Sequence, residues 1–146
     1  MYCKSGDKPL HTFYVWGSCN DEGSECAKAA YGVWSSKDRR GWGNRCTGDQ
    51  TIYAAELQAI VNVLKTVSRE PICVRIMTEE KAVLRACLNC RDWRDKGWKK
   101  ASGDYYACVD ELEVIAQPNN HVKFNPLYWP GTVEYLEATA RAPQHG

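Results

Sequence analysis

The stretch HTFYVWGSCNDEGSECAKAAYGVWSS, residues 11–36, decides how the fold begins. Its two ends, HTFYVWGS (11–18) and KAAYGVWSS (28–36), are rich in β-branched and aromatic residues, which favour strands. The polar segment NDEGSE between them has the composition of a hairpin turn. The sequence therefore predicts two antiparallel strands, with a third short strand at GWGNRCTG (41–48).

After Thr51 the apolar residues recur at helical spacing. These positions are Ala54, Leu57, Ile60, Val61, Leu64 and Val67. They predict an amphipathic helix of about four turns, which ends before the segment REP. Strands are predicted at ICVRIMT (72–78) and HVKFNPLY (121–128), and further helices over residues 80–93, 109–116 and 132–142.

This order of elements predicts one α/β domain over residues 11–142. We expect a five-stranded mixed sheet, made of a three-stranded antiparallel meander and two further strands, with helices on both faces. Residues 1–10 would form an N-terminal extension and residues 143–146 a short tail.

The composition excludes several classes of protein. The chain has 146 residues, and its 19 basic against 18 acidic side chains leave a net charge of +1, which does not attract nucleic acid as a whole. No apolar run is long enough for a membrane helix, and the N-terminal residues lack the apolar segment of a signal peptide. We therefore expect a cytoplasmic or nuclear protein that does not contact a membrane.

Eight cysteines are scattered along the chain, and only Cys87 and Cys90 are closely spaced. No second pair and no suitably spaced histidine completes a zinc site. We expect reduced thiols that pack as small apolar side chains, and leave open whether Cys87 and Cys90 have another role.

Five segments occur in one order along the chain: YVWGS (14–18), QTIYAAEL (50–57), MTEE (77–80), WRDKGWKKASG (93–103) and VEYLEATAR (133–141). They resemble, in order and at similar spacing, the motifs YTDGS, QTNxRAEL, TDS, WxxxGWKxxxG and NExADxLAR of the type 1 ribonuclease H (RNase H) family. The resemblance implies an RNase H-like fold over nearly the whole chain.

The resemblance also implies an active site. Members of the family hold two magnesium ions with four carboxylates and hydrolyse the RNA strand of an RNA/DNA hybrid. The four positions are here Trp16, Glu56, Glu79 and Glu137, so only Glu56 has the family's own residue. An indole cannot ligate magnesium. The extra methylene of Glu79 and of Glu137 moves each carboxylate by about 1.5 Å, against a tolerance of about 0.5 Å for a working site.

We therefore expect no catalysis and no bound cofactor, with Trp16 as a core aromatic that fills the former cleft. If the chain is active, Glu56, Glu79 and Glu137 would hold magnesium or manganese. Glu80 and Glu134 are alternative ligands.

Other parts of the family's machinery are also replaced. The loop NPLYWPGTV (125–133) lacks the histidine found before the family's last helix. The three positions of the family's DNA-phosphate pocket are here Asp49, Thr51 and Cys108, and Asp49 would repel a phosphate. The asparagine that contacts the groove has become Ile52 or Tyr53.

The basic segment after residue 90 resembles the protrusion with which the family rests on a duplex. Its candidate nucleic-acid-binding residues, together with Thr51, are Arg91, Trp93, Arg94, Lys96, Trp98, Lys99 and Lys100. Lysines beside aromatic rings can hold phosphate and sugar without reading the bases. Alternatively, the two tryptophans anchor the loop and the lysines are only solvated.

Three functions stay open. The favoured one is a catalytically inactive RNase H-like domain that serves as a protein interaction module or scaffold, with Ile52, Tyr53, Tyr128 and Trp129 as candidate surface residues. The second is a non-catalytic binder of RNA/DNA hybrid or double-stranded RNA, with weak affinity, and the third an active endoribonuclease on hybrids. The partner, and whether the chain forms a homodimer, are left open.

Overall fold

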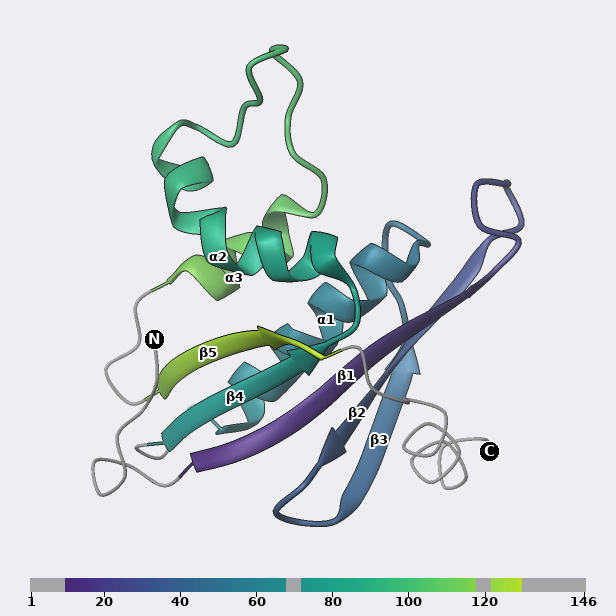
Figure 1. The fold of residues 1–146 in the computed structure, drawn as a ribbon. Coiled ribbons are helices and arrows are strands. Elements are labelled where there is room, and N and C mark those ends of the chain that lie inside the picture. Colours follow the sequence, from purple (N-terminus) through teal and green to yellow (C-terminus); the bar gives the residue numbers. More distant parts are fainter. Residues whose placement is uncertain (1–9, 68–71, 118–121, 130–146) are drawn as a thin grey trace.

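The computed structural model describes residues 10–67, 72–117 and 122–129. Five strands form one sheet in the order β3-β2-β1-β4-β5 (Figure 1). They are β1 (Leu10–Asn20), β2 (Lys28–Ser35), β3 (Arg40–Arg45), β4 (Ile72–Thr78) and β5 (Val122–Tyr128).

The pairing of the strands confirms the predicted mixed sheet. β1 pairs antiparallel with β2, and β2 antiparallel with β3, so the first three strands form the predicted meander. β4 pairs parallel with β1 on one side and with β5 on the other. The strand predicted at 41–48 ends at Arg45, because the chain leaves the sheet edge before Gly48.

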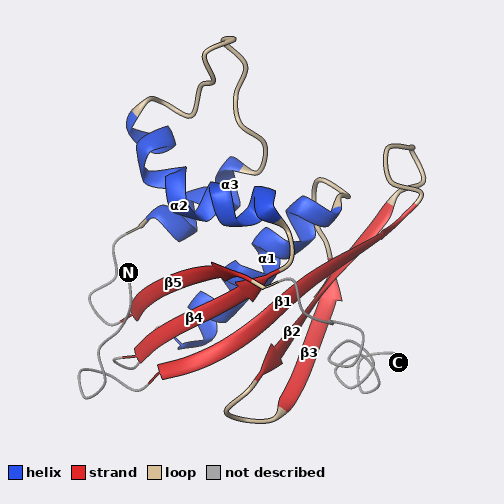
Figure 2. Cartoon of the chain, in the orientation of Figure 1, coloured by secondary structure: helices blue, strands red, loops and turns tan. Residues whose placement is uncertain are grey.

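Three helices are described: α1 (Ile52–Val67), α2 (Lys81–Asp95) and α3 (Val109–Ala116). They gather on one face of the sheet, α1 along β1 and β2, and α2 with α3 beside it (Figures 1 and 2). The predicted helix over 132–142, and with it the covering of the second face, lies outside the described residues. None of the described helices is long and apolar enough to cross a membrane.

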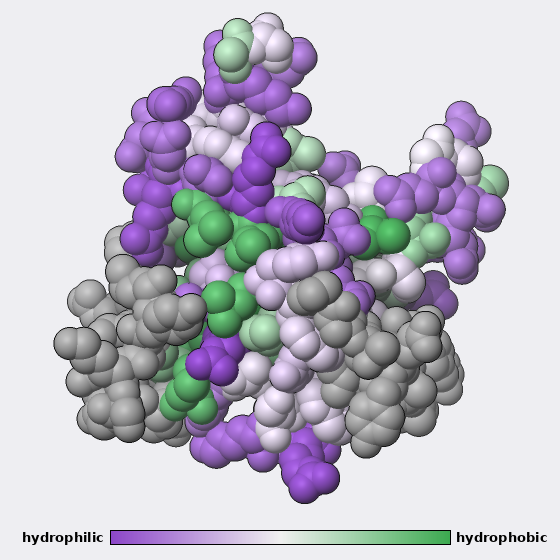
Figure 3. All heavy atoms as spheres, in the orientation of Figure 1, coloured by the Kyte–Doolittle hydropathy of each residue, from purple (hydrophilic) through white to green (hydrophobic). Residues whose placement is uncertain are grey.

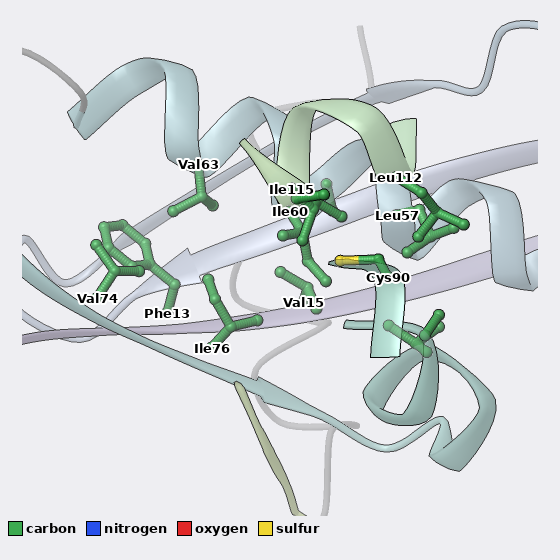
Figure 4. Close-up of a cluster of buried hydrophobic side chains, with 14 of the residues drawn as sticks. Phe13, Val15, Leu57, Ile60, Val63, Val74, Ile76, Cys90, Leu112 and Ile115 are labelled. Atoms are coloured by element: carbon green, nitrogen blue, oxygen red, sulfur yellow. The ribbon is translucent and has the colours of Figure 1, made fainter. Parts of the chain in front are cut away.

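The core lies between the sheet and the three helices. Alternating residues of β1, Phe13 and Val15, point toward Leu57 and Ile60 of α1 (Figure 4). Cys90 of α2 belongs to the same cluster, and Cys87 packs against it. Because side chains alternate along a strand, Tyr14 and Trp16 point to the opposite face of the sheet.

A long loop connects α2 to α3 and projects away from the sheet, at the top of Figure 1. Hydrophilic residues cover most of the visible surface of this projection (Figure 3). The loop contains the basic segment predicted to contact nucleic acid.

The cysteines are not all reduced thiols. Six described cysteines are free, namely Cys19, Cys26, Cys46, Cys87, Cys90 and Cys108. Cys73 on β4 is disulfide-bonded, so the expectation of reduced cysteines is wrong at this position. Nothing in the sequence spacing indicated this, because a disulfide depends on which side chains the fold brings together.

Candidate functional site

The strands β1 and β4 separate at the edge where the family would build its active site. Their parallel pairing runs from Leu10 opposite Cys73 to Tyr14 opposite Met77. β1 then continues to Asn20, whereas β4 ends at Thr78. In open α/β sheets, ligands bind at such carboxyl ends of neighbouring strands.

Glu56 of α1 lies in this gap and is 2% exposed. The Thr78 hydroxyl donates a hydrogen bond to Glu56 Oε1 at 2.5 Å. The pKa of the Glu56 carboxyl is raised to about 8, mainly by burial and to a smaller extent by the neighbouring carboxylates of Glu80 and Glu79, while the hydrogen bonds from Thr78 and the Gly17 backbone act against this rise. The carboxyl is therefore mostly protonated at neutral pH in the absence of a cation.

Gly17 allows α1 to approach β1 this closely. A Cβ at this position would lie 2.9 Å from the Ile52 carbonyl oxygen and 3.4 Å from Cγ of Glu56. The glycine of the YVWGS segment is thus required by the contact that places Glu56 in the gap.

Trp16 lies over β2 and not in the gap beside Glu56. It pairs with Gly32 across the β1–β2 ladder. A Cβ built on Gly32 would come within 2.3 Å of the Trp16 ring atoms Cε2 and Cζ2, so the indole lies directly over this glycine. Trp16 is 5% exposed and packs against Trp34 and Trp129. It is the buried core aromatic that we expected, but its ring covers β2 instead of filling the former cleft.

The other predicted carboxylates do not complete a metal site in the described part of the chain. Glu79 is exposed at the end of β4, and Glu80 precedes α2 with its backbone N–H donating to Thr78 Oγ1 at 3.0 Å. Glu134 and Glu137 lie outside the described residues. Within the described ranges, no three His, Cys, Asp or Glu side chains are placed to hold a metal ion.

A pocket lies beside Asp49 and Cys108, two of the three positions that the family resemblance assigns to a DNA-phosphate site. It has a volume of about 320 Å³ and lies between residues 47–49 and the start of α3. Its lining includes the carboxylates Asp49, Asp110 and Glu111, together with Cys108. Three carboxylates in one pocket repel a phosphate, so the pocket has the opposite charge preference from the one in the family.

Cys108 stands at the rim of this pocket in an unusual conformation. It is the N-cap of α3 with a φ of +58°, and its Sγ lies 3.9 Å from Asp49 Oδ2. Burial, followed by the charges of Glu111 and Asp49, raises the pKa of the Cys108 thiol to about 12. Thr51 is the third position of the family's phosphate pocket. In this chain it caps α1, because its Oγ1 accepts a hydrogen bond from the Ala54 N–H at 3.0 Å.

Two glutamines that the sequence analysis missed hold the wall of the pocket. Gln50 accepts the Ala29 N–H at 2.7 Å and donates to the carbonyls of Cys46 and Gly48. Gln58 accepts the Thr47 N–H at 3.0 Å and donates back to its carbonyl at 2.5 Å. The position of Asp49 is therefore set by side chains in the loop and in α1.

The basic loop is anchored by Trp98, which is 8% exposed and belongs to the shared core. Its Nε1 donates to Glu113 Oε2 at 3.2 Å, and its backbone N–H donates to the Trp93 carbonyl at 2.8 Å. Trp98 takes a φ of +64° after Gly97, which turns the chain into the loop. Trp98 therefore anchors the loop to the domain, which is the alternative role that the sequence analysis gave to this tryptophan.

Three of the five predicted basic residues make contacts inside the domain. Arg91 Nε and Arg94 Nη1 donate to the carbonyl of Ala116, the last residue of α3, at 3.1 and 3.3 Å. Lys96 forms an i,i+4 ion pair with Asp92 at 3.1 Å. The two arginine contacts hold α2 against α3, whereas the Lys96–Asp92 pair lies at the end of α2 itself.

The remaining two lysines lie beside two tyrosines that the sequence analysis did not single out. Lys99 and Tyr105 form an isolated antiparallel bridge, with the Lys99 Nζ 5.4 Å from the Tyr105 ring centroid. Lys100 Nζ lies 5.6 Å from the Tyr106 ring, which stacks on Trp93 at 3.8 Å and 7°. We call residues 98–106 the Lys–Tyr hairpin. Its sequence signal was the pair KK and the pair YY separated by the turn ASGD.

The four aromatic and apolar residues predicted as a protein surface do not form one patch. Tyr53 packs against the shared core, and burial raises the pKa of its hydroxyl; Ile52 is half-buried at the start of α1. Trp129 belongs to the Trp16 cluster and meets Tyr14 edge to face at 4.6 Å. Tyr128 is 38% exposed, with Lys81 Nζ 5.3 Å from its ring.

Comparison with known proteins places this geometry in a family. The family model of RNase H matches residues 8–128. No curated protein matched the chain. Among solved structures, a foamy viral protease–reverse transcriptase in complex with RNA/DNA hybrid shares 16% identity and a TM-score of 0.71 over 92% of this chain. The present chain spans only 19% of that protein's length.

Two further structures match the domain itself. The RNase H domain of prototype foamy virus shares 17% identity and a TM-score of 0.62, over 85% of this chain and 81% of the other. LC9-RNase H1, described as a type 1 RNase H with the type 2 active-site motif, shares 17% identity and a TM-score of 0.60, over 83% and 64%. Because the family model matches most of the chain, the chain is a member of the RNase H family.

Proposed function

We propose that this chain is a catalytically inactive RNase H-like domain that binds a partner macromolecule without hydrolysing it. The observation that carries the proposal is the position of Trp16. The residue that should bridge two metal ions is an indole, and its ring lies over Gly32 on the far side from α1. No rotation of an indole supplies a carboxylate oxygen to the gap where Glu56 lies.

The surroundings of Glu56 support this proposal. Its carboxyl is buried, tied to Thr78, and has a pKa raised to about 8 by burial. Magnesium prefers ionised oxygen ligands in near-ideal octahedral geometry, and it loses its water shell reluctantly. One buried carboxyl, together with Glu79 and Glu137, which by sequence are each one methylene longer than the family's residues, is a poor exchange for that shell, so we expect no metal cofactor. If cleavage did occur, Glu56, Glu79 and Glu137 would be the residues to hold magnesium or manganese.

A cleavage assay tests the loss of catalysis. We expect purified protein at high concentration to leave a labelled RNA/DNA hybrid intact with magnesium or manganese. Glu56→Gln is the control for contaminating nuclease. Metal-dependent cleavage that this substitution abolishes would overturn the proposal.

Restoring one residue should not restore activity. Trp16→Asp returns the family's residue, but Glu79 and Glu137 still carry an extra methylene, and Asp49 still occupies the phosphate pocket. We expect no hybrid cleavage by this variant. Cleavage by the single variant would mean that position 16 alone had silenced the site.

Nucleic acid is the partner that the geometry supports best. The Lys–Tyr hairpin places Lys99 and Lys100 over aromatic rings on a projecting loop (Figure 1). Among the described residues, neither lysine forms an ion pair. Structures of similar fold are described in complex with RNA/DNA hybrid and with double-stranded DNA. Retained binding through this loop, without cleavage, is consistent with all of these features.

A protein partner is the second candidate, and Tyr128 favours it. This tyrosine is exposed at the end of β5, next to the half-buried Trp129, and aromatic residues of this kind are enriched at protein interfaces. A partner that is captured by wild type and lost on Tyr128→Ala, with the variant still folded, would support a protein interaction module in place of a nucleic-acid binder.

A further inference from the structure

The Lys–Tyr hairpin presents one aromatic ring, that of Tyr105, which meets the Lys99 ammonium group of the same hairpin and lies outside the core. Tyr105 is 64% exposed, although it stands in a hairpin closed by its bridge to Lys99. Its neighbour Tyr106 is occupied by the stack on Trp93. The two adjacent tyrosines therefore differ in role, because Tyr106 helps to build the hairpin and Tyr105 faces solvent.

The hairpin is rigid enough to act as a preformed site. Trp98 is buried at its base, and the Tyr106 N–H donates to the Trp98 carbonyl at 3.0 Å. At its tip, the Lys100 N–H donates to the Asp104 carbonyl at 2.7 Å and the Gly103 N–H to the Lys100 carbonyl at 2.9 Å. A ligand that stacks on Tyr105 therefore does not have to order the loop first, which lowers the entropic cost of binding.

We propose that the Lys–Tyr hairpin is a stacking platform for an unpaired nucleobase, and that the preferred ligand of this domain is single-stranded nucleic acid. This inference rests on the proposed function, in which the domain binds nucleic acid without cleaving it. Proteins that bind single strands combine positive charge along the backbone path with exposed aromatic rings on which bases stack. Tyr105 supplies the ring, and Lys99 and Lys100 supply the charge.

The acidic pocket gives the reason for preferring a single strand over a duplex. Tyr106 belongs to the hairpin and also lines the pocket that contains Asp49, Asp110 and Glu111. A stiff duplex resting on Lys99 and Lys100 extends its phosphates across neighbouring surface, toward these carboxylates, which repel them. A flexible single strand can turn away, and its base faces are open to Tyr105, whereas a duplex hides them within its stack.

Fluorescence anisotropy tests the inference. The probes are one labelled sequence of about 12 nucleotides as single-stranded RNA, as single-stranded DNA and as an RNA/DNA hybrid, at about 50 and about 200 mM salt. The variants are Tyr105→Ala, Tyr105→Phe and the charge variant Lys99→Gln/Lys100→Gln. Tyr128→Ala is the matched control, because Tyr128 also stands beside a lysine, Lys81, but at the end of β5.

We expect the wild type to bind a single strand more tightly than the hybrid. Tyr105→Ala should weaken single-strand binding at least fivefold, the lower end of what loss of one base–aromatic stack costs. Tyr105→Phe, which retains the ring, should stay within about twofold, and Tyr128→Ala should match wild type. The charge variant should lower affinity and also flatten its dependence on salt. Circular dichroism confirms that each variant is folded.

Two kinds of failure are distinguishable. Binding that prefers the hybrid, or that Tyr105→Ala leaves unchanged, overturns the stacking platform and leaves the proposed binding of nucleic acid standing. No binding to any of the three probes overturns the proposed binding of nucleic acid and this inference together. Equal loss in Tyr105→Phe and Tyr105→Ala also overturns the inference, because the hydroxyl and not the ring would then carry the contact.

Discussion

Gly32→Ala tests the placement of the Trp16 indole over β2. The added Cβ would lie 2.3 Å from two atoms of the indole, and ordinary contact begins near 3.4 Å, so the ring or the strand must retreat by about 1 Å. Neither has room to do so. Trp16 is packed by Trp34 and Trp129, and β2 lies between β1 and β3. Overpacking of this kind costs about 1–3 kcal/mol of unfolding free energy.

A double-mutant cycle isolates this contact. Trp16→Ala alone should cost about 3–5 kcal/mol, because it removes a side chain that is almost fully buried. Once the indole is gone, Gly32→Ala should be neutral or stabilising by up to about 1 kcal/mol, since alanine in a strand loses less backbone entropy than glycine. The two changes should therefore be coupled by at least about 1 kcal/mol.

Urea unfolding at 25 °C, followed by far-UV circular dichroism, measures all four proteins. Trp16→Leu replaces Trp16→Ala if the latter does not fold. Gly17→Ala is the matched control, because its Cβ meets α1 on the opposite face and its cost should not be relieved by removing the indole. Gly32→Ala without loss of stability, or with the same loss in both backgrounds, would refute the placement of Trp16 over β2.

Three further predictions concern the gap and the pocket. Glu56 has a pKa of about 8 in the folded protein, against an ordinary value of about 4.5. Its contribution to stability should therefore be fully present below pH 4.5 and be lost as the pH rises to 8. Urea midpoints measured across this range should show that fall in the wild type and a flatter dependence in Glu56→Gln. At Cys108, whose φ is +58°, Cys108→Val should unfold at lower urea than Cys108→Asn, because a β-branched residue is strained there and asparagine is not; equal midpoints would contradict the strain. Burial raises the pKa of the Cys46 thiol to about 11 and that of the Cys108 thiol to about 12. At pH 8 iodoacetamide should therefore label the exposed Cys26 first, which peptide mass spectrometry measures. Faster labelling of Cys46 than of Cys26 would argue against the burial of Cys46.

The order of the elements follows from local sequence. The strand and helix periods predicted β1, β2, β4 and α1 closely, and α2 ends only two residues beyond its predicted range. Hydrophobic period and turn residues act over a few neighbouring positions, so they are visible in the chain itself. The loss of a carboxylate at position 16 is equally local, because it concerns one side chain in one motif.

The tertiary structure decided which of the predicted site residues share a surface. Tyr53, in the first turn of α1, packs against the core, and Trp129 lies on the opposite face, although both were predicted near one cleft. Arg91 and Arg94 donate hydrogen bonds to the end of α3, whereas Lys99 and Lys100 lie on the projecting hairpin beside the unpredicted and exposed Tyr105. Each of these outcomes depends on partners more than twenty residues away or on the exposure that packing leaves.

The sequence by itself determined the RNase H-like fold, the retained Glu56 and the absence of a metal-bridging carboxylate at Trp16. Only the tertiary structure decided that the indole lies over Gly32, that Glu56 accepts a hydrogen bond from Thr78, and that Cys73 is disulfide-bonded. The physical reason is that the direction, exposure and pKa of a side chain are set by the groups that pack against it. Trp16 and Gly32 meet only through strand pairing, and Glu56 and Thr78 only because α1 packs on the sheet.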